Sequence, residues 1–163
     1  MKGYLFVVLV VSSLWATLAA GQASQQASKA KSSPTKVELD KLLTVQEVEK
    51  IGGRAVKRTV DYQGMTFTTQ EQVMGSAGDF SALMVTLMPS IPDWEGWAKG
   101  NGLETHVSGV GDDARQDGTK YMFVLRKGTR IVMMQSMKDP YHDQPYFSPD
   151  QMREFGKLIA SRL

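Results

Sequence analysis

Hydrophobic and polar positions alternate along several short segments after residue 55, and a period of two predicts β-strands. Val56, Val60 and Tyr62 alternate with polar residues, and the segment 65–74 repeats the pattern. The segment 80–88 is apolar at almost every position, as expected of a central strand covered on both faces. The middle of the chain is therefore predicted to form a sheet.

Two more strands are predicted at 121–125 and 131–137, where apolar residues again dominate. Lys127 and Gly128 between them are typical of a tight hairpin turn, which makes the two strands antiparallel. We therefore expect a mainly antiparallel sheet of about five to six strands.

Three helices are predicted from apolar residues at helical spacing and from residues typical of helix ends. The first, short and N-terminal, begins at a capping box formed by Thr44 and Glu47. The second is short and central, with Pro92 suited to its first turn and Gly100 to its end. The last begins at 148–151 and carries apolar side chains on one face: Met152, Phe155, Ile159 and Leu163. Helices packed on a sheet of hairpins make the predicted fold class α+β.

Residues 1–23 have the pattern of a secretory signal peptide. Lys2 precedes an apolar run from Leu5 to Leu18, and small residues follow it. The run is shorter than the roughly 20 apolar residues that a membrane span needs. We therefore expect cleavage after Gly21 or Ala23, a periplasmic or secreted protein, and no stable membrane span after cleavage.

The next segment, 24–38, is predicted to be a flexible linker, and residues 39–163 a single domain. Up to Lys36 the linker has no large apolar residue, so it cannot bury enough surface to offset the entropy of ordering. The domain carries 15 Lys and Arg against 16 Asp and Glu, a net charge of −1. Nucleic-acid binding requires a basic surface on the fold itself, so we exclude it.

The chain has no cysteine and none of the common catalytic signatures. A disulfide, a thiolate metal site and a cysteine nucleophile are therefore excluded. A hydrolytic triad needs a histidine, and the only candidates are His106 and His142. A hydrolase of unknown substrate is the third hypothesis for function, and a protein that is not an enzyme is favoured.

The glycine-rich segment 109–118 is a weak candidate for a ligand loop. Its start has the spacing G-x-G-x-x-A of a dinucleotide-binding turn, but a charged, turn-rich stretch follows where a helix would be needed. Arg115 and Val124 occupy places where an EF-hand has oxygen ligands. An irregular calcium site is the remaining alternative, with three carboxylates: Asp112, Asp113 and Asp117.

Ten methionines are an unusual feature of this chain. Met133 and Met137 would share one face of a strand, and His142 follows shortly after. Thioether and imidazole groups suit Cu(I) in an exported protein without thiolates. A periplasmic Cu(I)-handling protein using these three residues is the second hypothesis, and the alternative is that methionine packs the core.

Aromatic residues mark two candidate binding segments. Trp94 and Trp97 lie three apart on the short central helix, where they would form an exposed recognition surface or cover the sheet. Tyr141, Tyr146 and Phe147 lie in a loop rich in Pro and Asp, which would form a second lip of a groove. The first hypothesis is therefore a non-enzymatic exported module that binds a protein or an apolar small ligand in the cell envelope.

The run V-S-G-V-G-D-x-A at 107–114, followed by two strands and a closing helix, resembles a pattern in small bacterial exported proteins of unknown function. Some of those proteins are lipoproteins. The opening residues Leu43, Thr44, Glu47 and Val48 are similar to their first helix. The resemblance implies a compact α+β fold in the cell envelope and brings no catalytic residues. This chain lacks the lipidated cysteine of the lipoproteins, so a lipid anchor is not expected.

Overall fold

A computed structural model of the chain describes residues 36–62, 64–73 and 76–163. The predicted signal peptide, residues 1–23, and most of the predicted linker lie outside the described residues. The described residues belong to one unit of the chain, residues 31–163. Among them, no helix combines the length and the apolar character needed to cross a bilayer.

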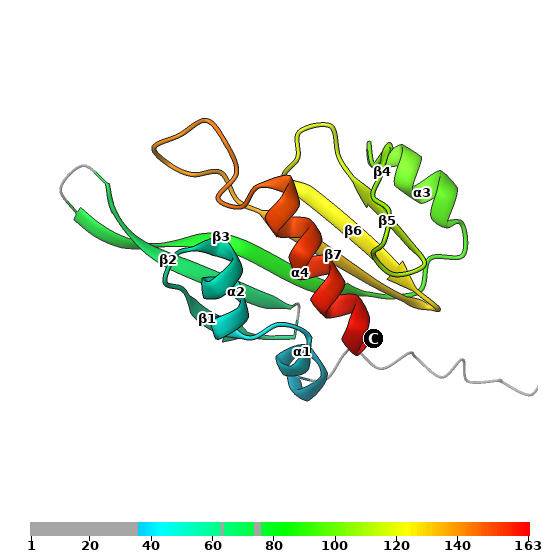
Figure 1. The fold of residues 1–163 in the computed structure, drawn as a ribbon, viewed down its shortest axis with the longest axis horizontal. Coiled ribbons are helices and arrows are strands. Elements are labelled where there is room, and N and C mark those ends of the chain that lie inside the picture. The colour runs from blue at the N-terminus through cyan, green and yellow to red at the C-terminus, as the bar shows by residue number, and fades with distance from the viewer. Residues whose placement is uncertain (1–35, 63, 74–75) are drawn as a thin grey trace, which may run out of the picture. The chain divides into compact units, whose positions relative to one another are not determined.

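Seven antiparallel strands form one sheet in the order β1-β2-β3-β7-β6-β5-β4 (Figure 1). Two meanders, β1–β3 and β4–β7, are joined where β3 pairs with β7. The predicted α+β class is confirmed, and the strand count exceeds the prediction. The strands are β1 (Lys57–Val60), β2 (Met65–Val73), β3 (Ser76–Met88), β4 (Thr105–His106), β5 (Asp113–Gln116), β6 (Met122–Lys127) and β7 (Arg130–Ser136).

The helices of the described residues are α1 (Lys36–Leu42), α2 (Val45–Gly52), α3 (Trp94–Gly100) and α4 (Pro149–Arg162). The sequence predicts the last three. The predicted capping box is present in α2, where the side chains of Thr44 and Glu47 each accept a backbone N–H of the other. Helix α1 begins at Lys36, so the end of the predicted linker is helical.

Alternation of side chains along the strands divides the core into two clusters on opposite faces of the sheet. The inner cluster lies beneath α1, α2 and α4 and includes Phe67, Phe123 and Phe155. In Figure 1, α4 crosses the sheet over β6 and β7, whereas α3 lies at the end occupied by β4 and β5. The outer cluster is small and is covered by α3; its buried members are Trp94, Ala98, Leu103, Val124 and Ile131.

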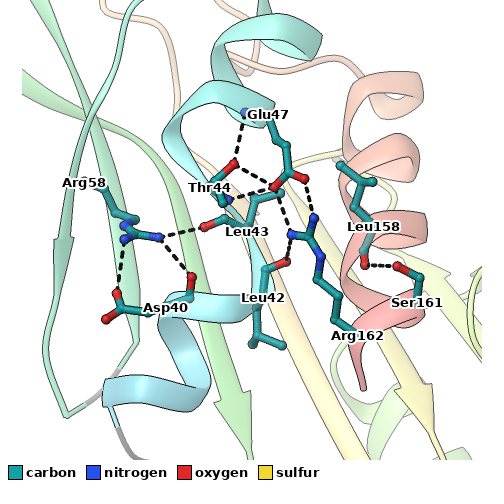
Figure 2. Close-up of polar contacts among 9 residues, drawn as sticks. All are labelled: Asp40, Leu42, Leu43, Thr44, Glu47, Arg58, Leu158, Ser161 and Arg162. Atoms are coloured by element: carbon teal, nitrogen blue, oxygen red, sulfur yellow. Dashed lines mark hydrogen bonds and ion pairs between the residues drawn. The ribbon is translucent and has the colours of Figure 1, made fainter.

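Two arginines fasten the N-terminal helices to the rest of the fold (Figure 2). Arg162 in α4 donates to the Leu42 carbonyl at 3.0 Å and to Glu47 Oε2 at 2.9 Å, and it also pairs with Glu47 Oε1. Arg58 in β1 donates to the Asp40 carbonyl at 3.2 Å and pairs with the Asp40 carboxylate at the same distance. These bonds satisfy carbonyls at the end of α1 and hold α1 and α2 on the inner face.

Candidate functional site

Helix α3 carries the aromatic residues singled out in the sequence. It begins after Asp93, whose carboxylate caps the helix by accepting the N–H of Gly96 at 2.9 Å. Pro92 precedes this cap, so it lies before the first turn rather than inside it. The helix turns Trp94 and Ala98 toward the outer face of the sheet.

Trp94 lies at the centre of a group of charged side chains. Its indole Nε1–H donates to Asp113 Oδ2 at 2.5 Å. Arg115 Nε donates to the same oxygen at 3.2 Å, and His106 Nδ1 lies 3.3 Å from Asp113 Oδ1. The guanidinium carbons of Arg115 and Arg126 lie 5.8 and 5.7 Å from the centre of the Trp94 ring. Trp94 therefore contacts two cations, which cation–π attraction favours, and a carboxylate, which accepts its indole N–H.

A cavity of about 350 Å³, here called the α3–β5 cavity, lies beside this group. The side chain of Arg115 at its wall is only 6% exposed, yet its Nη2 donates at 2.5 Å to Glu95, whose side chain is 74% exposed. The volume is near the lower end of the range of about 300–1,000 Å³ typical of small-molecule sites. The lining residues are Glu95, Gly96, Lys99, Leu103, Glu104 and Arg115.

Local charges keep both central groups ionised. Burial raises the pKa of Asp113, but hydrogen bonds from Trp94 and Arg115 and the nearby charges outweigh it, so the pKa lies below its usual value. The hydrogen bond to Glu95 raises the pKa of Arg115, and Asp113 adds to this effect against burial. The wall of the cavity thus holds a permanent cation.

The segment with the sequence V-S-G-V-G-D-x-A places β5 at this site. Gly109 and Gly111 have φ angles of 77° and 62°, which glycine adopts without strain. A Cβ atom on Gly111 would lie 2.5 Å from the Arg126 carbonyl oxygen. Asp112 N donates to that oxygen at 2.8 Å, and Asp112 Oδ2 accepts the N–H of Gly128 at 2.7 Å. The segment therefore fastens the start of β5 to the β6–β7 hairpin.

Of the two alternatives for the tryptophan pair, an exposed surface or a cover for the sheet, the structure favours the second. Trp94 is 3% exposed, and Trp97 is half-buried and stacked on it with ring centres 5.6 Å apart. Trp94 is a buried member of the outer cluster, and Trp97 packs against that cluster as a partly buried residue.

The predicted second lip of the groove is not formed. Tyr141 is 50% exposed, but Tyr146 and Phe147 are buried in the inner cluster, where Phe147 packs edge-on against Phe155 at 5.2 Å. The loop follows the last residue of β7, whereas α3 packs on Ile131 at the beginning of that strand. The two aromatic segments therefore lie at different ends and faces of the sheet.

The proposed copper ligands do not converge. Met133 packs against the outer cluster and Met137 against the inner cluster, so the prediction that they share a face is wrong. Strand β7 ends at Ser136, and the alternation does not continue to Met137. His142 instead has its Nδ1 at 3.2 Å from Asp139 Oδ2.

The three carboxylates of the alternative calcium site are engaged by donors of the chain. Asp112 accepts the N–H of Gly128 and Asp113 the bonds described above, while Asp117 accepts the N–H of Met122 at 2.9 Å. Within the described residues, no group of three His, Cys, Asp or Glu side chains is placed to hold a metal ion.

Each histidine faces a carboxylate, as in a triad, and each is about two-thirds exposed. His106 lies 3.3 Å from Asp113 and His142 lies 3.2 Å from Asp139. In the part of the chain that the structure describes, neither imidazole is hydrogen-bonded to a serine or threonine hydroxyl. The arrangement supplies a base and an orienting group without a nucleophile.

A second groove, of about 390 Å³, lies between α2 and α4. Lys157 and Glu154 in its wall are solvated, with side chains 42% and 52% exposed, and Glu47 is already held by Arg162. A hydrated charge has no desolvation penalty for a ligand to offset. This groove is therefore a weaker candidate than the α3–β5 cavity. Its lining residues are Glu47, Lys50, Ile51, Glu154, Lys157, Leu158 and Ser161.

Sequence reasoning missed the buried Arg115 and its partner Glu95. The charged residues after Gly111 predict a turn, but β5 is a four-residue strand that buries both Arg115 and Gln116. The available signal was one apolar residue, Ala114, between Asp113 and Arg115, which is too short a pattern to separate a strand from a turn.

Comparisons with protein-family models, curated proteins and solved structures find no match to this chain. Its own geometry is therefore the basis of the function proposed below.

Proposed function

We propose that this chain is a non-enzymatic, exported binding module that holds a small, partly apolar ligand in the α3–β5 cavity. Export rests on the signal-peptide pattern of residues 1–23, and the binding role rests on the cavity beside Trp94. A periplasmic or secreted location follows from the same leader.

A buried guanidinium at the wall of an accessible cavity carries the proposal. Arg115 is buried and yet lines the cavity, next to the fully buried Leu103. Removing a cation from water is costly, so folded proteins pair such a group closely or use it for binding. An apolar wall beside a fixed polar group is the usual composition of a small-molecule site.

Native mass spectrometry of the protein recovered from the exported fraction tests this function. We expect an N-terminus at residue 22 or 24 and a retained small mass that denaturation releases. A full-length N-terminus would contradict export by a cleaved signal peptide. Recovery of the bare polypeptide, with no shift of the α3 amide resonances on adding apolar ligands, would contradict small-ligand binding.

A pair of variants locates the ligand. Lys99→Trp places a large ring at the α3–β5 cavity, and Lys157→Trp makes the same change at the α2–α4 groove. Both side chains are exposed, so both variants should fold. We expect the retained mass to disappear only in Lys99→Trp. Loss in Lys157→Trp alone would assign the ligand to the other groove.

A further inference from the structure

The pairing of Arg115 with Glu95 joins two residues of opposite exposure. Arg115 is 6% exposed and Glu95 is 74% exposed, and the Nη2···Oε2 distance is 2.5 Å. The other end of the guanidinium is occupied within the fold, because Nε donates to Asp113. The Nη2 atom therefore pairs with Glu95, whose carboxylate can rotate into water without a change in the fold.

The group around Trp94 holds more guanidiniums than carboxylates hydrogen-bonded to the indole. Two guanidiniums, those of Arg115 and Arg126, lie near the Trp94 ring, and Asp113 is the one carboxylate hydrogen-bonded to the indole. The Nε of Arg126 is buried and has no hydrogen-bond partner among the described residues. Glu95 supplies the second negative charge from the surface, in the position that a ligand carboxylate would take.

We propose that the α3–β5 cavity binds the carboxylate of an amphipathic monocarboxylate, which replaces Glu95 at Arg115 Nη2. This inference rests on the binding function proposed above. The apolar part of the ligand lies against Leu103 and the aliphatic stem of Lys99, and the Lys99 ammonium adds attraction at the rim. Glu95 thus holds the carboxylate position at Arg115 in the free protein.

The exchange needs little free energy because one ion pair is replaced by another. Glu95 regains water when it leaves, and the ligand carboxylate replaces the negative charge that the buried Arg115 guanidinium loses. The ligand carboxylate gains a charge-assisted hydrogen bond to a guanidinium that is already held in place by Asp113. Glu104 on the same rim disfavours a dianion such as a phosphate monoester, since its negative charge repels the second charge.

Matched pairs of probes test the inference on the protein as the cell produces it. Hexanoate is titrated against hexanamide, and a leucine-terminated tripeptide against its C-terminal amide, with the amide resonances of 96–103 as the readout. Each acid should bind at least tenfold more tightly than its amide. Tighter binding of hexanoate assigns a free acid as the ligand, and tighter binding of the tripeptide assigns a peptide C-terminus.

The variants Glu95→Gln and Glu104→Gln separate displacement from general charge effects. Both residues are exposed and line the cavity, but only Glu95 is bonded to Arg115. We expect Glu95→Gln to tighten hexanoate binding two- to fivefold and Glu104→Gln to change it less than half as much. Equal effects of the two variants would overturn the displacement of Glu95.

The outcomes also distinguish this inference from the function on which it rests. If acids and amides bind equally, the cavity is a binding site and the carboxylate assignment is wrong. If none of the four probes shifts the resonances of α3 in the wild type or in Glu95→Gln, both the assignment and the binding function fail.

Discussion

The two faces of the sheet are covered in different ways. Three helices close the inner face over a large apolar cluster, whereas one seven-residue helix closes part of the outer face. Around the outer cluster the fold also places the buried Arg115, the largely buried Asp113 and the α3–β5 cavity. The inner face therefore supplies most of the hydrophobic stabilisation, and the outer face combines partial burial with charge.

This difference explains where a ligand site can exist in so small a domain. A close-packed apolar cluster has no room for a ligand and no polar group to orient one. A single short helix leaves space at its edges. Because it covers the sheet incompletely, the charged groups beside it are shielded enough from water to interact strongly and are still accessible to a ligand. The following variants test this division of roles, from the largest expected effect to the smallest.

Phe155→Ala should have the largest effect on stability. The ring is fully buried in the inner cluster and packs against Phe147, so its removal leaves a cavity and costs about 3–5 kcal/mol of the free energy of unfolding. Urea denaturation measures the loss. Trp97→Ala in the half-buried part of the outer cluster should cost clearly less, and an equal loss would contradict the division between the two faces.

Trp94→Phe should lower stability by about 1–3 kcal/mol because Asp113 loses the indole donor in a largely buried position. Loss of the indole donor should also raise the pKa of Asp113 toward its usual value. During acidification, the stabilisation provided by ionised Asp113 should therefore disappear at a higher pH in the variant than in the wild type. An NMR titration of the Asp113 carboxyl measures this change. The control is Trp97→Phe, whose stacked ring should leave the pKa of Asp113 unchanged.

Glu47→Gln tests the polar fastening of the inner face. The hydrogen bond from Arg162 lowers the pKa of Glu47 from 4.5 to about 2 in the folded protein. Since the folded pKa is depressed, the ionised pair stabilises the fold above about pH 4.5, and this stabilisation is lost as the pH falls toward 2. We expect the variant to lose about 1–2 kcal/mol at pH 7, allowing for solvent screening, and to show a flatter decline in acid.

Denaturation curves between pH 7 and 2 measure that difference. Glu154→Gln is the matched control, because Glu154 is 52% exposed and pairs with Lys157 one turn away. The prediction is wrong if the wild type and Glu47→Gln lose stability in parallel over this range.

The smallest expected effects come from the helix caps. Ser148→Ala removes the cap of α4 and Asp93→Ala the cap of α3, and each should cost about 1 kcal/mol. Their effects on ligand binding should differ, since only α3 carries Glu95 and the cavity wall. Hexanoate titration of the two variants measures this, and equal weakening of binding would contradict the assignment of binding to the outer face.

Much of the inner face could be predicted from the sequence. The capping box at Thr44 and Glu47, the hairpin at Gly128 and the apolar stripe of α4 are local patterns, and the structure contains all three. Helix α1 was missed because it has only seven residues and directly follows the polar linker, so its few apolar positions do not make a recognisable helical pattern.

The candidate site was predictable only in part. The pattern identified Trp94 as unusual but not its burial, and it placed Arg115 in a turn. Whether a tryptophan on a short helix faces water or a sheet depends on which strand lies beneath it. That strand, β6, is nearly thirty residues further along the chain.

The sequence by itself determined the α+β class, the alternation that gives the sheet its two faces, and the first residues of α2 and α4. These features depend on neighbours within a few residues, so local physical chemistry is sufficient to predict them. Only the tertiary structure decided that Met133 and Met137 separate and that Arg115 is buried beside Trp94 and Glu95. Burial and charge pairing depend on residues distant in sequence. They contribute to the free energy of folding only once the strands have paired.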